Sequence, residues 1–142
     1  MKIFIKIIGI LLLILLVFIG YLYFTFPKFE PQVKVVEISN DRGEVIFIKK
    51  KVWGLLGNDQ VIVISNSSNE DFKPDDSSEY IYKGLIEVFY KVENDTLFFY
   101  TQKESLVPNN FQSLIKVKQI FLTNLDYDKF KNEYKQLGLK IF

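Results

Sequence analysis

The strongest feature of the hydrophobic pattern is one continuous apolar segment near the amino terminus. From Ile7 to Pro27 no residue carries a formal charge, and residues 10–19 are all Ile, Leu, Val or Phe. About 20 helical residues at 1.5 Å each span the roughly 30 Å hydrocarbon core of a bilayer. The central ten residues favour insertion by about 3–6 kcal/mol. The pattern therefore predicts a transmembrane anchor over residues 1–27.

A cleaved signal peptide and a buried core helix are the two alternatives to a retained anchor. A signal peptide has a shorter apolar region, followed by small residues at the cleavage site. Here the run ends in GYLYFTFPKF, which places large aromatic residues where cleavage needs small ones. Aromatic residues at the end of a span suit the bilayer interface. We therefore expect the anchor to be retained, and a core helix of this length and composition is unusual.

After the anchor the pattern changes to short runs that are typical of β-strands. Pro27 and Pro31 make the connection stiff, so a short linker is expected over residues 28–33 and a domain over residues 34–142. The runs VKVVEI, EVIFIKKKVW and QVIVIS are separated by turn-rich segments. Several of them are apolar on both faces, which favours a sandwich or a small barrel over a sheet that is open to water.

A hairpin is predicted in the second half of the domain. The runs LIEVFYKV and TLFFYTQ flank the turn END, and Ile86, Val88, Tyr90 and Val92 alternate onto one face. The next run, LIKVKQIFLT, changes its apolar parity near Lys118, which predicts a strand with a bulge.

The last segment, NLDYDKFKNEYKQLG, has the period of a helix, and LKIF can add a final short strand. Asn124 or Asp126 can cap this helix, and Gly138 can end it. The expected fold class is all-β to α+β: a transmembrane helix, then a small antiparallel β-sandwich or half-barrel with one carboxyl-terminal helix. The apolar face of that helix is formed by Tyr127, Phe130, Tyr134 and Leu137.

Composition excludes several kinds of chemistry. The chain has 142 residues and neither cysteine nor histidine, so disulfides, thiol nucleophiles, serine–histidine catalysis, and zinc or haem sites built on those residues are excluded. We expect no cofactor and no metal. After Pro27 there are 16 basic and 17 acidic residues. This balance creates no field that would attract nucleic acid, and no nucleic-acid partner is expected.

The string KKKVWGLLGND joins two predicted strands and has three interpretations. Its apolar side chains can fold back to plug the end of the core, because a lone tryptophan is usually structural. They can instead form a loop tip that enters the membrane interface with lysines behind it. They can also form a contact for a protein partner. The candidate partner or membrane contact residues are Lys49, Lys50, Lys51, Trp53, Leu55 and Leu56.

The acidic segment between the strands does not have the spacing of a calcium-binding loop. We interpret it as a solvated loop. A hydrolase that uses paired carboxylates is an alternative to a non-catalytic protein, but no pair stands out in the sequence. The acidic residues of the segment are Glu70, Asp71, Asp75, Asp76 and Glu79.

The charges around the span barely discriminate its orientation, because Lys2 and Lys6 precede it and Lys28 and Lys34 follow it. A short basic head before an apolar run is typical of a signal anchor, and a long following domain is translocated largely regardless of its charge. We expect a cytoplasmic amino terminus and an extracytoplasmic domain.

The anchor, VWGLLGNDQVIVIS, EYIYKGLIEVFYK and the closing YKQLGLKIF together resemble small single-pass bacterial envelope proteins. The resemblance implies a bacterial inner membrane location and no particular activity, ligand or catalytic residue. The leading hypothesis is a non-catalytic, membrane-anchored domain that presents a β-rich surface for protein binding or envelope assembly. The alternative is a module that binds a lipid or other apolar small ligand in a small β-barrel.

Overall fold

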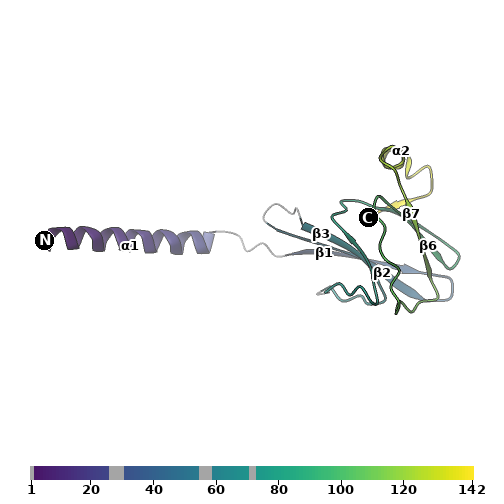
Figure 1. Ribbon diagram of the computed structural model, residues 1–142, viewed down its shortest axis with the longest axis horizontal. Helices are drawn as coiled ribbons and strands as arrows, with labels where there is room; N and C mark the ends of the chain where they lie inside the picture. Colours follow the sequence, from purple (N-terminus) through teal and green to yellow (C-terminus); the bar gives the residue numbers. More distant parts are fainter. Residues whose placement is uncertain (1, 26–30, 55–58, 71–72) are drawn as a thin grey trace. The chain divides into compact units, whose positions relative to one another are not determined.

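The protein is described by a computed structural model that covers residues 2–25, 31–54, 59–70 and 73–142 (Figure 1). The chain divides into two units, residues 1–30 and residues 31–142. The first strand begins at Gln32, within the linker that the sequence predicts over residues 28–33.

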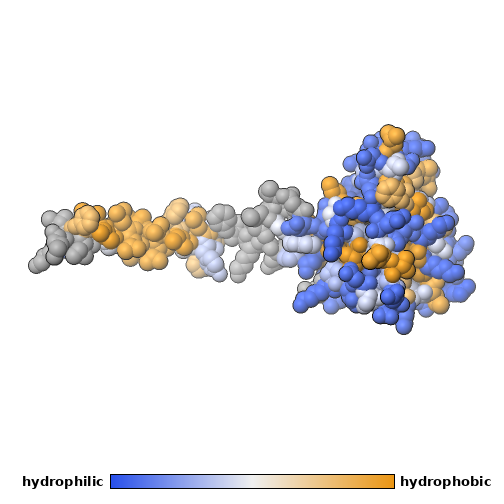
Figure 2. All heavy atoms as spheres, in the orientation of Figure 1, coloured by the Kyte–Doolittle hydropathy of each residue, from blue (hydrophilic) through white to orange (hydrophobic). Residues whose placement is uncertain are grey.

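The first unit contains helix α1, Lys2–Thr25. Its segment Lys6–Thr25 is long and apolar enough to cross a membrane, and no part of it is buried against other residues. Figure 2 shows apolar side chains along the helix. A core helix of a soluble protein would instead have most of these side chains buried.

The first sheet has the strand order β1-β2-β3-β4, and all of its pairs are antiparallel. The predicted turn between the first two strands is confirmed: Asn40 Oδ1 accepts hydrogen bonds from the amides of Arg42 and Glu44, and Gly43 has φ of 81°. The strands are β1 (Gln32–Ser39), β2 (Val45–Trp53), β3 (Asp59–Ser65) and β4 (Tyr80–Lys83).

The second sheet has the order β7-β6-β5-β8 and contains the predicted hairpin, which turns at Asn94 with φ of 52°. One pair differs from the antiparallel expectation. β7 pairs with β6 in parallel, because residues 102–115 lead the chain back to the start of β6 before β7 begins. The strands are β5 (Phe89–Glu93), β6 (Thr96–Thr101), β7 (Lys116–Phe121) and β8 (Lys140–Ile141).

The main core lies between the two sheets. One cluster of buried side chains includes Ile48 and Ile62 from the first sheet and Tyr90 and Leu97 from the second. Tyr82 packs against Phe99 across this core, with ring centroids 4.8 Å apart. The predicted two-sheet fold is therefore confirmed. Within the described residues the sheets form separate ladders that do not close into a barrel.

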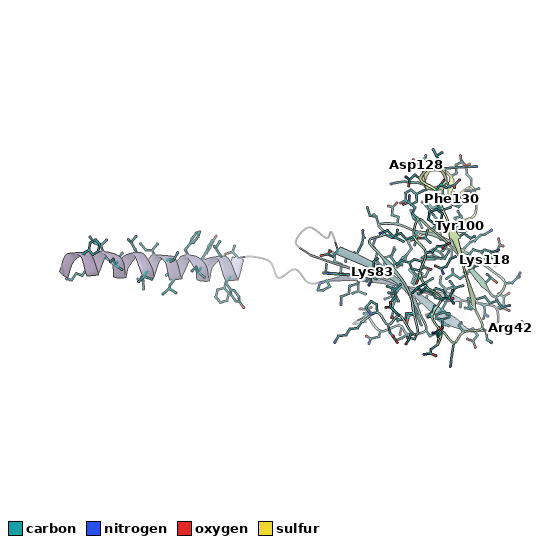
Figure 3. The ribbon with its side chains drawn as sticks, in the orientation of Figure 1. Arg42, Lys83, Tyr100, Lys118, Asp128 and Phe130 are labelled. Atoms are coloured by element: carbon teal, nitrogen blue, oxygen red, sulfur yellow. The ribbon has the colours of Figure 1, made fainter. Side chains whose placement is uncertain are left out.

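The carboxyl-terminal helix α2, Asn124–Glu133, covers the other face of the second sheet. Phe89 of β5 contacts the rings of Tyr127, Phe130 and Tyr134 with centroids 5.6–6.1 Å apart, so the predicted apolar helix face is largely confirmed. Leu137 lies beyond the end of the helix and is exposed. Figure 3 labels Phe130 beside Tyr100 of β6, which it also contacts.

The cap of α2 is Thr123 and not either predicted residue. The Thr123 side chain accepts a hydrogen bond from the amide of Asp126, and the Asp126 carboxylate accepts one from the amide of Thr123. This is a capping box, which satisfies two donors that the helix leaves unpaired. The Thr123 hydroxyl and amide hold the pKa of Asp126 below its usual value.

The predicted bulge near Lys118 is wrong, because the β6–β7 register is unbroken from Thr96–Lys116 to Thr101–Phe121. The change of parity arises because a polar residue, Gln119, points inward. Its Oε1 accepts hydrogen bonds from the Tyr82 hydroxyl at 2.9 Å and the Ser105 amide at 2.8 Å. Its Nε2 donates to the Ser105 carbonyl at 2.9 Å. Burial raises the pKa of Tyr82 far above its usual value, so its phenol remains a donor.

Replacing Gln119 should therefore cost more than replacing Tyr82. Gln119→Leu leaves the buried Tyr82 hydroxyl and both backbone groups of the half-buried Ser105 without their partner, and we expect it to lower the free energy of unfolding by about 2–4 kcal/mol. Tyr82→Phe removes one donor, and Gln119 Oε1 keeps the Ser105 amide, so the expected loss is about 1 kcal/mol. Denaturation of the full chain in detergent measures both. Equal losses would contradict this role of Gln119.

Candidate functional site

Strand β3 of the first sheet is buried on both of its faces. Ile62 and Ile64 of β3 point into the main core, whereas Val61 and Val63 point away from it and are also buried. Val33 and Ile81, from β1 and β4, pack with these two valines. We call this side, which faces away from the second sheet, the outer face. Its burial requires a further covering layer.

The segment between β3 and β4 returns to the outer face. Lys49 of β2 is 1% exposed, and its Nζ lies 3.4 Å from Oε1 of Glu79, whose side chain is 11% exposed. Asp75 orders the turn before Glu79: its carboxylate accepts hydrogen bonds from Ser77 and Ser78, and the Ser78 hydroxyl is the main cause of its lowered pKa. The predicted solvated loop is therefore ordered in part, and Glu79 belongs to a buried ion pair.

An open groove of about 640 Å³ lies at one end of the outer face. All four strands contribute to this end, because β2 and β4 finish where β1 and β3 begin. Figure 3 labels Lys83 at this end of the unit. The apolar lining is formed by Pro31, Trp53, Val61 and Pro74.

The charged residues of the groove are mainly basic. Of the lining residues that the structure describes, Lys51, Lys73 and Lys83 are basic and Asp59 alone is acidic. Asp59 pairs with Trp53 in the β2–β3 register. Gly54 follows Trp53 with φ of 91°, and a Cβ on it would lie 3.0 Å from Oδ2 of Asp59. Glycine is therefore required here both by the backbone conformation and by the nearby carboxylate.

The structure separates the three consecutive lysines that the sequence groups together, because successive side chains of a strand point to opposite faces. Lys49 is buried against Glu79, and only Lys51 lines the groove. Lys50 lies on the other face, where its Nζ donates to the carbonyl of Ile86. Burial, and then the nearby Lys34, lower the pKa of Lys50.

Of the predicted contact residues, the structure therefore brings Trp53 and Lys51 together. Leu55 and Leu56 lie outside the described residues. Trp53 is 40% exposed, lies on the outer face and is absent from the buried clusters, which does not support its interpretation as a core plug. Lys83 and Lys73 were missed. The alternation in YIYK places Lys83 beside Ile81 once that strand is recognised, but no sequence signal identifies Lys73.

A second, smaller hollow of about 360 Å³ contains acidic residues from the segment before β4 and the segment after β6. Asp76, Glu79 and Glu104 line it together with Lys83 and Lys103. Glu79 already contacts Lys49 and the Asp75 amide. Among the residues that the structure describes, no group of three acidic side chains is placed to hold a metal ion.

Comparison with known proteins adds no relative: the chain matches no family model, no curated protein and no solved structure. The resemblance to small bacterial envelope proteins stays a prediction.

Because of where Trp53 lies, truncating its side chain should have a small effect on stability. Because it is partly exposed and outside the core, Trp53→Ala should lower the free energy of unfolding by about 1 kcal/mol or less. Phe99→Ala, at a fully buried ring, should cost about 3–5 kcal/mol. Thermal melts of the full chain in detergent compare the two. A Trp53→Ala loss as large as that of Phe99→Ala would restore the plug interpretation.

The Lys49–Glu79 ion pair should have a larger coupling free energy than its 3.4 Å distance suggests, because the pair is buried. A double-mutant cycle with Lys49→Met and Glu79→Gln is expected to give a coupling of about 1–3 kcal/mol. The matched control is Lys91 and Glu93, which are closer, at 2.7 Å, but more exposed. Water screens this control pair, so its coupling should be much smaller. Equal couplings would contradict the covering role of Glu79.

Proposed function

We propose that the protein is a non-catalytic, single-pass membrane protein that holds a binding domain at the bilayer surface, with the groove on the outer face as its binding site. The amino terminus is cytoplasmic and the domain extracytoplasmic, in the inner membrane of a bacterial envelope. The observation that carries the proposal is helix α1, whose 20-residue segment Lys6–Thr25 is long and apolar enough to cross a membrane.

The length of the connection supports a site close to the membrane. Five residues separate Thr25, the end of α1, from Pro31, which lines the groove. A chain of this length spans at most about 22 Å. If α1 spans the bilayer, the end of the sheet that carries the groove is tethered within this distance of the end of the helix.

The chemistry of the groove supports binding and not catalysis. The chain has no histidine or cysteine, and the described lining of the groove contains one carboxylate among lysines and apolar side chains. Its volume falls within the roughly 300–1,000 Å³ of typical small-molecule sites. This favours a small ligand, although the site is an open groove and not the interior of a barrel.

Binding of another envelope protein is the second candidate. Ten of the residues that the structure describes line the groove, whereas a standard interface uses about 20–30 residues on each side. A protein partner would therefore need additional surface. Leu106 and Val107, which are 85% and 70% exposed, favour such a contact because apolar side chains at partner sites lose water on binding.

Retention of the anchor is tested by alkaline carbonate extraction of cell membranes. We expect the full-length chain to remain in the membrane pellet and detergent to release it. Leu13→Arg with Leu16→Arg should move the chain to the supernatant, because two arginines near the centre of the span cost about 5–7 kcal/mol. The matched control, Leu13→Ala with Leu16→Ala, should stay in the pellet.

A cleaved signal peptide gives a different result. Mature wild-type chain in the carbonate supernatant, shortened by the apolar segment, would contradict the anchored protein that we propose.

A further inference from the structure

We propose that the groove seats one anionic phospholipid taken from the anchoring bilayer, with an acyl chain against Trp53 and the headgroup phosphate between Lys51 and Lys83. This inference rests on the proposed function, because it requires the domain to be tethered at the membrane. It adds the chemical class of the ligand and the residues that recognise it.

A row of three residues across the first sheet carries the inference. Val61 of β3 pairs with Lys51 of β2 on one side and with Lys83 of β4 on the other. Their side chains share the outer face, so one buried valine is flanked by two lysines. Two strand spacings place the Cα atoms of the lysines about 9–10 Å apart. Flexible lysine side chains at this separation can both reach one phosphate.

The next row of the sheet supplies an apolar wall and, within the described lining, the one acidic side chain. Trp53 pairs with Asp59, two residues along each strand from Lys51 and Val61. Trp53 lines the groove while still 40% exposed, so a ligand there would remove apolar surface from water. Pro31 and Pro74 extend this surface.

Charge complementarity indicates an anionic ligand. Among the described residues that line the groove, Lys51, Lys73 and Lys83 are basic and only Asp59 is acidic, although the chain after Pro27 has slightly more acidic than basic residues. The excess of positive charge is therefore local. An apolar surface bounded by ammonium groups fits an amphiphile with a negative headgroup better than a neutral ligand.

The short connection between α1 and the groove favours the anchoring bilayer as the source of the ligand. Pro31 lines the groove and lies six residues after the end of α1, so membrane lipid is the amphiphile available at high local concentration. A nucleic acid would need a wider basic surface than three lysines.

The test uses the only tryptophan of the chain, which lies in the groove. The full-length protein is reconstituted in phosphatidylcholine vesicles that contain increasing fractions of phosphatidylglycerol with brominated acyl chains. Bromine quenches tryptophan emission at short range. A parallel series uses brominated phosphatidylcholine, which has the same chains without net charge.

We expect brominated phosphatidylglycerol to reach half-maximal quenching at a fraction at least tenfold lower than brominated phosphatidylcholine. Each lysine is worth about fivefold in affinity for an anionic headgroup, so Lys51→Gln with Lys83→Gln should shift the phosphatidylglycerol value by roughly 25-fold. The control pair, Lys129→Gln with Lys140→Gln, removes the same charge from exposed positions elsewhere and should leave it unchanged. Native mass spectrometry should find one phosphatidylglycerol per chain.

Equal quenching by the two lipids, or no effect of the Lys51 and Lys83 substitutions, would overturn the inference. The inference would also be overturned if neither lipid quenched Trp53 while an envelope extract protected Trp53 from quenching by acrylamide. That result would indicate a polypeptide occupant. These quenching results do not affect the proposed function if the chain stays in the membrane pellet after carbonate extraction. Release of the chain by carbonate is the separate failure of the proposed function.

Discussion

The structure depends on one constraint: the central strand β3 is apolar on both faces and must therefore be covered on both. Ile62 and Ile64 are covered by the second sheet, and Val61 and Val63 lie on the opposite side, where they are also buried. A two-layer sandwich would leave that side in water. The chain adds a partial third layer through the segment that precedes β4, and the ion pair of Lys49 with Glu79 joins this layer to the sheet. A lysine in the middle of a strand is thus part of the packing, with its charge matched by a residue 30 positions away.

The groove follows from the same packing. The covering layer reaches Lys49 in the middle of β2, whereas at the end of the strand Trp53 remains partly exposed. The groove is the part of the outer face that stays open. It is apolar, like the covered part of the same face, because Trp53 and Val61 line it. Because β1 starts at this end of the sheet, the open surface lies beside the point where the chain enters the domain from α1. The proposed binding at the membrane surface thus follows from two features: the covering layer leaves this end of the outer face open, and the chain enters the domain at the same end.

Much of this fold could be predicted from the sequence, because period-two and period-three-to-four patterns are local. The hairpin β5–β6, the aromatic face of α2 and the short strand β8 all follow from such patterns. Some errors were avoidable: strand alternation alone separates Lys49 and Lys51 from Lys50. Other features depend on distant residues, and no local pattern identifies them. These include the parallel pairing of β7, the inward Gln119 that satisfies Tyr82, and the partnership of Lys49 with Glu79.

Thiol labelling measures whether the outer face is covered at Ser65 and open at Lys83, and whether the domain is extracytoplasmic as we propose. The chain has no native cysteine, so a single introduced thiol reports one position. Lys83→Cys places it in the groove, and Ser65→Cys places an isosteric thiol at a side chain that is 2% exposed on the same face. With a membrane-impermeant maleimide on intact cells, we expect rapid labelling at position 83 and none at position 65 until the protein is denatured. Equal labelling at both positions would contradict the covered face, and labelling of position 83 only after lysis would contradict the extracytoplasmic domain.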